Sequence, residues 1–330
     1  MEAAAQAATQ WGLGARASRL LAGTTAWHTA LEESLVAWFG AEAALVYPSG
    51  YLANLGTLGA LLSPQDAVFV DRLAHASLLD AARATRARFR VFRHNDPTHL
   101  AALLVRAGKA RYRLIVTEGV FSMDGDRAPL AALADVAEAH DALVYVDDAH
   151  GAFVLGVTGR GSPEAAGIPH ERFLYMGTLG KALGCQGGFV SGPKTLIEFL
   201  RNRARTFIYS TALAVPVAAA AAAALRLLER EPRRREHLWD RVRSLERRLA
   251  PLERFTPSES PIRPIIVGDT ARALTLARSL WDRGIWAPAI RPPSVPAGAA
   301  RIRLSVTALH TEAQVDALVK ALRESIVHSP

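Results

Sequence analysis

The sequence predicts an α/β protein with a mostly parallel central sheet and helices on both faces, followed by a small C-terminal α+β domain. Between about residues 44 and 176, short apolar segments with the length of buried strands alternate with helix-length segments. From about residue 230 the order changes, because a charged helix is followed by short strands and two further helices. We therefore expect an N-terminal segment at 1–20, a large domain at 21–229 and a small domain at 230–330.

The elements of the large domain follow from its apolar runs and from the residues that interrupt them. A short helix and a glycine-containing loop occupy residues 1–23, and Thr24 or Thr25 is placed to cap the next helix. Strands are predicted at 44–47, 67–70, 89–92, 114–118, 142–146 and 173–176, and helices at 51–62, from 75, at 97–107, at 130–140 and within the alanine-rich run 212–225.

The small domain begins with the densest group of arginines in the chain, between Arg230 and Arg248. Leu238, Val242 and Leu245 recur through this run at roughly helical spacing, which favours an amphipathic helix with a solvated basic face over a nucleic-acid contact. The remaining elements are strands at 265–267, near 286–290 and at 302–306, and helices at 271–283 and 311–326.

Composition narrows the class of protein further. No stretch offers about 18 consecutive apolar residues, and the first residues lack the pattern of a secretory signal. A single cysteine, Cys185, is typical of a reducing cytoplasm. We expect a cytoplasmic protein that binds no membrane, nucleic acid or metal. Its formal net charge of +8 favours an anionic substrate such as a coenzyme A thioester.

Two short motifs supply an acid and an amine for one chemical task. Asp147 and His150 follow the strand predicted at 142–146, at the carboxyl end where open α/β sheets bind ligands. Lys181 is flanked by glycine and apolar residues, a setting in which poor solvation favours the neutral amine. A neutral amine forms Schiff bases, and a carboxylate can hold a pyridinium nitrogen. Taken singly, each residue is equally typical of a surface lysine or a turn-forming aspartate. Together they predict a site for pyridoxal 5'-phosphate (PLP).

Further motifs occur in the same order along the chain: Asp71-x-x-x-His75-Ala76-Ser77, Phe121-Ser122-Met123-Asp124-Gly125, Asp147-x-x-His150 and Gly180-Lys181. From about Arg19 to the last helix, this pattern resembles the α-oxoamine synthases. Those are fold-type-I PLP-dependent transferases that join an amino acid to an acyl thioester with loss of CO₂. Ordinary fold-type-I aminotransferases usually carry a tyrosine where this chain has His150. The resemblance implies that the large domain binds PLP.

The resemblance also implies a role for each matching residue. Lys181 is expected to form the Schiff base and then to serve as base and acid at the substrate Cα, while Asp147 keeps the pyridine nitrogen protonated. His150 and Ser122 are expected to hydrogen-bond the phenolic oxygen of PLP, and His75 to stack on its ring. The catalytic residues are therefore Lys181, His75, His150 and Asp147.

A second set of residues is expected to hold the phosphate. The backbone N–H groups of Gly50 and Tyr51 open a helix after a strand, at the positive end of its dipole, and Thr178 supplies a hydroxyl. Ser210 and Thr211 match the family segment that reaches the phosphate of the neighbouring subunit. They imply a homodimer with active sites at the subunit interface, although the two residues are also suited to capping the alanine-rich helix.

Substrate contacts are expected near the C-terminus. Arg303 matches the family arginine that binds the amino acid carboxylate, and Arg291 lies in a second matching segment. Alternation along the strand would place Arg301 and Arg303 on the same face. Because burying both charges is costly, we expect one of them to pair with a local acid.

The segment around Arg291 is most similar to the biotin-pathway branch of the family. That implies condensation of L-alanine with pimeloyl-CoA, or with a pimeloyl carrier protein, to give 8-amino-7-oxononanoate and CO₂. Two alternatives stay open. One is a relative that uses another acyl thioester, or glycine or serine, as in secondary metabolism. The other is a non-catalytic PLP-binding partner subunit.

Two features depart from the family pattern. Relatives usually carry several dozen more residues before the point where this sequence begins, and those residues help to close the active site. The glycine-rich loop, Gly12 to Arg19, also holds alanines that restrict its backbone. We expect both departures to bear on acyl specificity.

Overall fold

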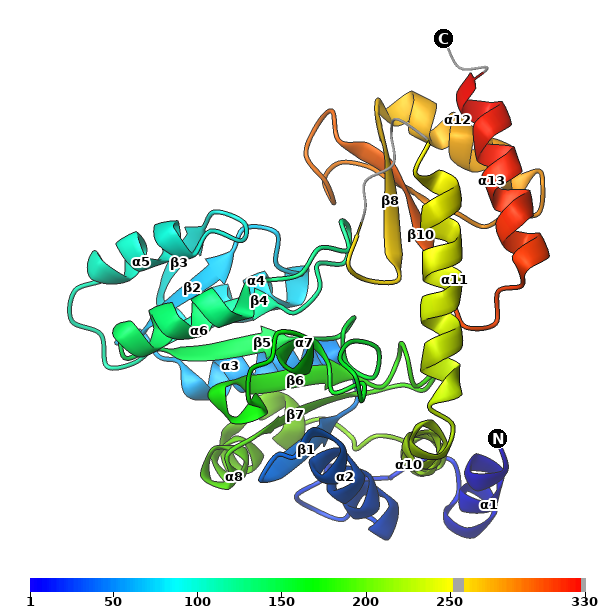
Figure 1. The fold of residues 1–330 in the computed structure, drawn as a ribbon. Helices are drawn as coiled ribbons and strands as arrows, with labels where there is room; N and C mark the ends of the chain where they lie inside the picture. The colour runs from blue at the N-terminus through cyan, green and yellow to red at the C-terminus, as the bar shows by residue number, and fades with distance from the viewer. Residues whose placement is uncertain (252–257, 328–330) are drawn as a thin grey trace. The chain divides into compact units, whose positions relative to one another are not determined.

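The computed structural model describes residues 1–251 and 258–327. It divides into two compact units (Figure 1). The first comprises residues 1–120 and 128–230, and the second comprises residues 121–127 together with the chain from 231 onward. Among the described residues, no helix combines the length and apolar character needed to cross a membrane.

A seven-stranded sheet forms the centre of the first unit, in the order β1-β7-β6-β5-β4-β2-β3. Strands β2 to β6 pair in parallel, whereas β7 runs antiparallel to both of its neighbours. The strands are β1 (Ala43–Tyr47), β2 (Ala67–Asp71), β3 (Arg88–Phe92), β4 (Arg113–Glu118), β5 (Leu143–Asp147), β6 (Leu174–Thr178) and β7 (Gly188–Gly192).

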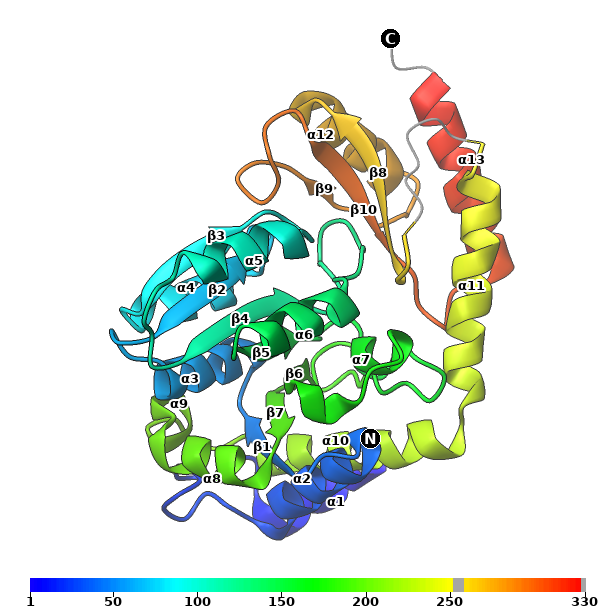
Figure 2. The ribbon, with the colours of Figure 1, turned by 60° about the vertical axis from the view of Figure 1, so that its left-hand side comes forward.

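Helices lie against both faces of this sheet (Figures 1 and 2). They are α1 (Glu2–Trp11), α2 (Ala26–Phe39), α3 (Gly50–Leu61), α4 (Ala76–Ala84), α5 (Pro97–Val105), α6 (Leu130–Ala139), α7 (Ser162–Ala165), a 3₁₀ turn (His170–Arg172), α8 (Lys194–Arg203), α9 (Arg205–Ile208) and α10 (Val215–Arg230). The N-cap of α2 is Thr25, one of the two residues, Thr24 and Thr25, that were predicted to cap this helix.

Alternation along the strands explains the two-sided packing. Leu45 and Tyr47 of β1 join one apolar core with α3, α4 and α8. Ala44 and Val46 of the same strand join the other core, with α2 and α10. Successive side chains of a strand point to opposite faces, so a sheet covered on both faces needs apolar residues at nearly every position. The predicted α/β class, with a mostly parallel sheet, is confirmed.

Strand β7 and helices α7, α8 and α9 were not predicted. β7 begins with Gly188, one of the glycines near Lys181 that the sequence analysis took as part of the surroundings of the lysine. Gly188 instead permits a close backbone approach, because a Cβ there would lie 2.6 Å from the Gly50 Cα. A strand with so few side chains carries little periodic signal.

The second unit packs helices α11 (Arg233–Leu249), α12 (Thr270–Trp281) and α13 (Glu312–Val327) against a three-stranded sheet. Its strands are β8 (Ile262–Gly268), β9 (Ala289–Ile290) and β10 (Ala300–Ser305), in the antiparallel order β8-β10-β9. β9 is shorter than predicted, and the residues before it form no strand. The division of the chain into functional domains stays a prediction.

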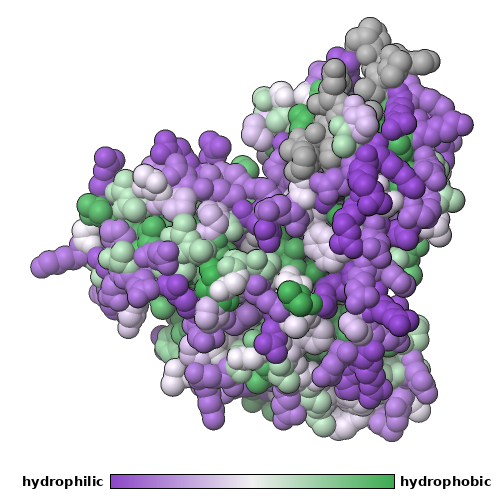
Figure 3. All heavy atoms as spheres, viewed as in Figure 1, coloured by the Kyte–Doolittle hydropathy of each residue, from purple (hydrophilic) through white to green (hydrophobic). Residues whose placement is uncertain are grey.

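Helix α11 is amphipathic, as predicted for the arginine-rich run. Val242, Leu245 and Leu249 are buried in the core of the second unit. Hydrophilic side chains gather along α11 and α13 on the face shown in Figure 3. Arg248 and Arg241 pair with Glu312 at the start of α13, which neutralises part of the basic face.

Candidate active site

A cavity of about 230 Å³ opens in the first unit where the carboxyl ends of β4, β5 and β6 meet the N-terminal turns of α3 and α4. Such an edge is where open α/β sheets place ligands. Seven of the predicted site residues line this cavity: Gly50, Tyr51, His75, Asp147, His150, Thr178 and Lys181. Five further residues complete its wall: Asn54, Ser77, Glu118, Ala149 and Met176.

Asp147 is the last residue of β5 and is only 4% exposed. Its Oδ2 accepts a hydrogen bond of 2.7 Å from the side-chain amide of Asn54, and its Oδ1 accepts one of 3.1 Å from the backbone N–H of Ala149. Both donors fix the orientation of the carboxylate, because each holds a different oxygen. A charge-assisted hydrogen bond of this kind is also among the stronger ones.

Lys181 lies in the loop after β6, with its Nζ 2.9 Å from Nε2 of His150. The side chain is exposed in the single chain. The expectation that it would be poorly solvated was therefore wrong for this chain on its own. The surrounding loop is rich in glycine, and glycines have no side chains with which to cover the amine.

His75 caps the N-terminus of α4, and two groups of Ser77 lie within hydrogen-bonding distance of its ring nitrogen Nδ1. The backbone N–H of Ser77 lies 3.2 Å from His75 Nδ1, and the Ser77 hydroxyl lies 2.7 Å from the same nitrogen. His75 is itself exposed on the cavity side of the unit. The backbone of His75 also hydrogen-bonds the carboxyl group of Glu118 at the end of β4, so the residue is held from both the helix and the sheet.

Helix α3 begins at the other end of the cavity. Ser49 caps it by accepting the N–H of Leu52, and the first-turn N–H groups of Gly50 and Tyr51 have no acceptor within their own helix. A Cβ at Gly50 would lie 3.0 Å from the Met176 side chain, so glycine keeps this wall open. The Thr178 hydroxyl donates to the Gly187 carbonyl at 2.9 Å.

Two buried carboxyl groups flank Asp147. Glu118 ends β4 directly beside it in the sheet register. Burial, with a smaller effect from the Asp147 charge, raises the pKa of Glu118 well above the ordinary glutamate value. Burial also raises the pKa of Asp148 to about 6, although hydrogen bonds from Ser162 and Tyr175 oppose that shift. Asp148 thus anchors the loop behind the site rather than facing the cavity.

The predicted substrate residues belong to the second unit. Arg303 on β10 is half-buried, and its Nε donates to the Ser122 carbonyl at 2.6 Å while Nη1 donates to the Ser305 hydroxyl at 2.7 Å. Burial lowers the pKa of Arg303. Arg301 is 4% exposed and pairs with Asp124, which confirms that one of the two arginines is neutralised locally. Arg291 is exposed after β9.

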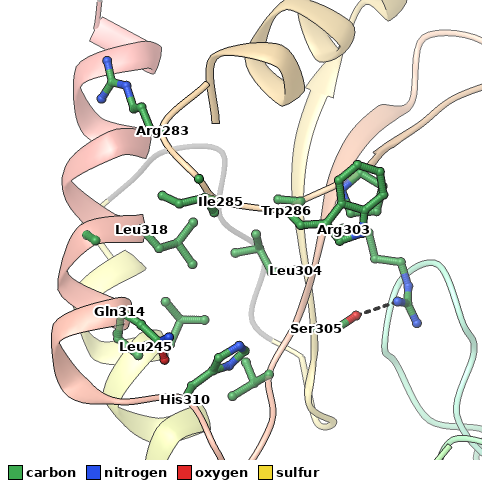
Figure 4. Close-up of a pocket in the computed structure, with 16 residues that line it drawn as sticks. Leu245, Arg283, Ile285, Trp286, Arg303, Leu304, Ser305, His310, Gln314 and Leu318 are labelled. Carbon is green, nitrogen blue, oxygen red and sulfur yellow. Dashed lines mark hydrogen bonds between the residues drawn. The ribbon is translucent and has the colours of Figure 1, made fainter. Parts of the chain in front are cut away.

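A second, larger pocket of about 610 Å³ lies within the second unit (Figure 4). Leu245, Ile285, Leu304 and Leu318 form its apolar wall, and Arg303 extends from its edge toward Ser305. Ser210 and Thr211 line neither this pocket nor the smaller one. Thr211 instead pairs with Ser18 through an isolated β-bridge.

The sequence analysis gave no role to three polar residues of the cavity wall: Asn54, Ser77 and Glu118. Asn54 had a usable signal, since it is a buried polar residue in an otherwise largely apolar helix. Ser77 belonged to a quoted motif, and Glu118 ended a predicted strand. What the sequence could not indicate was that all three face Asp147 or His75, because they come from three different elements.

The fold and this strand-end site define a known class. The chain belongs to the aminotransferase class I and II family, whose model matches residues 1–322, and within it to the α-oxoamine synthases. The predicted family and fold type are thereby confirmed.

Similar curated proteins carry one name. The chain is 49% identical over 317 residues to an 8-amino-7-oxononanoate synthase of Aromatoleum aromaticum, covering 96% of this chain and 82% of the relative. It is 50% identical over 320 residues to a protein of the same name from Alkalilimnicola ehrlichii, with the same two coverages.

Solved structures agree on the fold. A serine palmitoyltransferase from S. paucimobilis with a bound PLP–myriocin aldimine matches with a TM-score of 0.95 and 34% identity, covering 98% of this chain and 82% of that one. An 8-amino-7-oxononanoate synthase from Francisella tularensis matches with a TM-score of 0.84 and 26% identity, covering 99% and 92%. The cofactor implied by the motifs is thus the one bound in a structure of closely similar fold.

Proposed function

We propose that this chain is a PLP-dependent acyltransferase that condenses L-alanine with a pimeloyl thioester to give 8-amino-7-oxononanoate, CO₂ and the free thiol. The observation that carries the proposal is the placement of Asp147, Lys181 and His150 around one cavity at the strand ends. Relatives of that name, 49% identical to the chain, support the choice of substrates. We further propose a cytoplasmic homodimer to which Ser210 and Thr211 contribute across the interface.

The residues of the cavity fit PLP by their chemistry. Asp147 offers an oriented carboxylate to a ring nitrogen, and Lys181 offers an amine to an aldehyde. The first-turn N–H groups of α3 suit a phosphate, and Gly50 leaves the space that a side chain would fill. PLP, when bound, withdraws electrons from the amino acid Cα.

The chain's own groups then move and hold protons. Asp147 would keep a proton on the ring nitrogen of bound PLP, and His150, together with Ser122 as the family resemblance implies, would hold its phenolic oxygen. The Lys181 amine takes the proton from the alanine Cα and later returns one to the same carbon. His150 Nε2 accepts a hydrogen bond from the Lys181 amine, and both residues line the cavity.

Arg303 would bind the alanine carboxylate through its planar fork. One C–C bond forms, between the alanine Cα and the acyl carbonyl carbon, and the thioester C–S bond breaks. The thiolate leaves and takes up a proton, and the carboxylate that Arg303 had bound departs as CO₂. Burial of the Arg303 guanidinium strengthens its attraction for a carboxylate, since less water screens the pair.

Thiol release tests this proposal. The PLP-loaded protein, given L-alanine and pimeloyl-CoA, should release coenzyme A and CO₂ in equal amounts, and the Lys181→Ala variant should release neither. Glycine and serine with pimeloyl-CoA, and alanine with palmitoyl-CoA, serve as substrate controls. Faster turnover with serine and palmitoyl-CoA would instead assign the chain to another branch of the family. A dimer in light scattering should accompany activity.

A further inference from the structure

Asn54 links two residues of the proposed site that no sequence motif connects. Its side chain is 1% exposed, in the first turns of α3. Its amide nitrogen donates to Asp147 Oδ2 at 2.7 Å and to Ser77 Oγ at 2.8 Å. Its amide oxygen accepts the Tyr145 hydroxyl at 2.7 Å. A buried amide that lacked such partners would cost stability, so the full set indicates a built network.

The orientation of the Asn54 amide is fixed by its neighbours. A carboxylate without a proton can only accept hydrogen bonds, so the amide nitrogen must face Asp147. The Tyr145 hydroxyl must then donate to the amide oxygen, and burial raises the pKa of Tyr145 so that it keeps its proton. The two ends of the side chain are therefore not interchangeable.

The direction of the remaining hydrogen bonds follows from Ser77. Its backbone N–H can only donate, and it meets His75 Nδ1 at 3.2 Å, so this nitrogen carries a lone pair. The Ser77 hydroxyl lies 2.7 Å from the same Nδ1 and likewise donates to it, which leaves Ser77 Oγ to accept from Asn54. The chain of donors runs in one direction, from Asn54 through Ser77 to His75.

We propose that Asn54 and Ser77 are positioning residues that hold His75 as the tautomer protonated on Nε2 and, through the same amide, hold the Asp147 carboxylate. The inference rests on the proposed function, because it assumes that Asp147 and His75 contact the same PLP molecule. His75 then presents a hydrogen-bond donor at the nitrogen that Ser77 leaves unused. Loss of Asn54 should loosen both residues together, whereas loss of the Ser77 hydroxyl should loosen His75 and leave the hydrogen bond to Asp147 in place.

Cofactor affinity in matched variants tests the proposal. Asn54→Leu removes the donor to Asp147 and to Ser77, and Ser77→Ala removes only the hydroxyl. Leu58→Val is the control, because Leu58 is equally buried in the same helix, does not line the cavity and has no polar group that could join the network. We expect the Kd for PLP, measured by fluorescence, to rise about ten- to a hundredfold in Asn54→Leu and less in Ser77→Ala. Ser77→Thr should restore the wild-type Kd, which a merely structural effect would not do.

Two readouts keep the outcome decisive. In ¹⁵N-histidine spectra of the full-length protein, with His75→Gln to assign the signal, the wild-type His75 should show a proton on Nε2 and none on Nδ1. The proposal is overturned if the proton lies on Nδ1, or if Asn54→Leu and Leu58→Val bind PLP equally well. If either result is obtained while the protein still releases thiol in the presence of alanine, the proposed role of Asn54 and Ser77 is wrong but the proposed function is not.

Discussion

The Nζ of Lys181 lies 2.9 Å from the Nε2 of His150, although the two residues follow different strands of the sheet. Adjacent parallel strands β5 and β6 bring their carboxyl ends together, and each contributes one residue from the loop that follows it. A lysine amine can donate to the histidine lone pair in this geometry. The contact therefore joins the two motifs that the sequence offered separately.

Loss of His150 should impair turnover more than cofactor binding. His150→Phe removes the nitrogen that contacts Lys181, and we expect kcat to fall by about a hundredfold or more, since positioned proton-transfer groups contribute on this scale. Thiol release under saturating substrates measures the effect. His140→Phe, a change outside the cavity, should leave kcat within a factor of two, and equal losses in the two variants would contradict the assignment.

Arg303 should determine the affinity for the amino acid. Arg303→Lys keeps the charge but removes the planar fork, so the KM for L-alanine should rise about tenfold or more while PLP binding stays unchanged. Arg243→Lys, an exposed change on α11, provides the control. If the KM rises in Arg291→Lys but not in Arg303→Lys, the carboxylate is bound by Arg291 instead.

Glu118 should make stability depend on pH. Its pKa is higher in the folded than in the unfolded protein, so the unfolded chain loses this proton first as the pH rises. Stability that is present below about pH 4.5 is then progressively lost up to the folded pKa, by at most about 1.4 kcal/mol per pH unit. Glu118→Gln has no such proton.

The E118Q variant should accordingly gain stability over the wild type as the pH rises, in urea unfolding from pH 4.5 to 8. Exposed Glu33→Gln is the matched control, and its difference from wild type should stay flat across the same range. An E118Q difference that is also flat would show that the buried carboxyl does not titrate across this range.

A buried ion pair holds the N-terminal loop to the first unit. Arg19 and Glu32 form a bidentate ion pair with hydrogen bonds of 2.9 and 3.0 Å, and their side chains are 3% and 11% exposed. Glu32 also accepts a hydrogen bond from the backbone N–H of Val46. Arg19→Met leaves the carboxylate with only the longer contact to Arg201, at 3.9 Å, and should lower the free energy of unfolding by about 3 kcal/mol.

Chemical denaturation measures that loss. The exposed pair Arg278–Asp282 offers the comparison, and Arg278→Met should cost less than about 1 kcal/mol. Combining Arg19→Met with Glu32→Met should recover part of the loss, because it removes a buried charge that keeps only one long ion-pair contact. A double variant less stable than either single one would contradict the explanation.

The sequence was most informative where local chemistry is distinctive. Asp147, His150 and Lys181 lie at strand ends whose apolar runs are short and clear, and the structure gathers them around one cavity. Asn54 escaped notice because its role depends on Asp147, 93 residues away along the chain. No local pattern encodes such a contact. Strand β7 was missed for the same reason, since the need for glycine at Gly188 arises from its contact with Gly50, far away along the chain.

The solvation of Lys181 could not be derived from neighbouring residue types. The glycines beside it suggested enclosure, but glycine provides backbone freedom rather than cover, and the amine is exposed in the single chain. Arg301 illustrates a better-founded inference. The cost of burying two arginines on one strand face predicted a local acid, and Asp124 is that acid.

Locating the cofactor tests the central claim most directly. The PLP-loaded protein is reduced with borohydride, digested and mapped by mass spectrometry. We predict that the phosphopyridoxyl group lies on Lys181 and is lost in Lys181→Arg. Modification confined to Lys109, Lys194 or Lys320, or no retained cofactor in a folded dimer, would contradict the account.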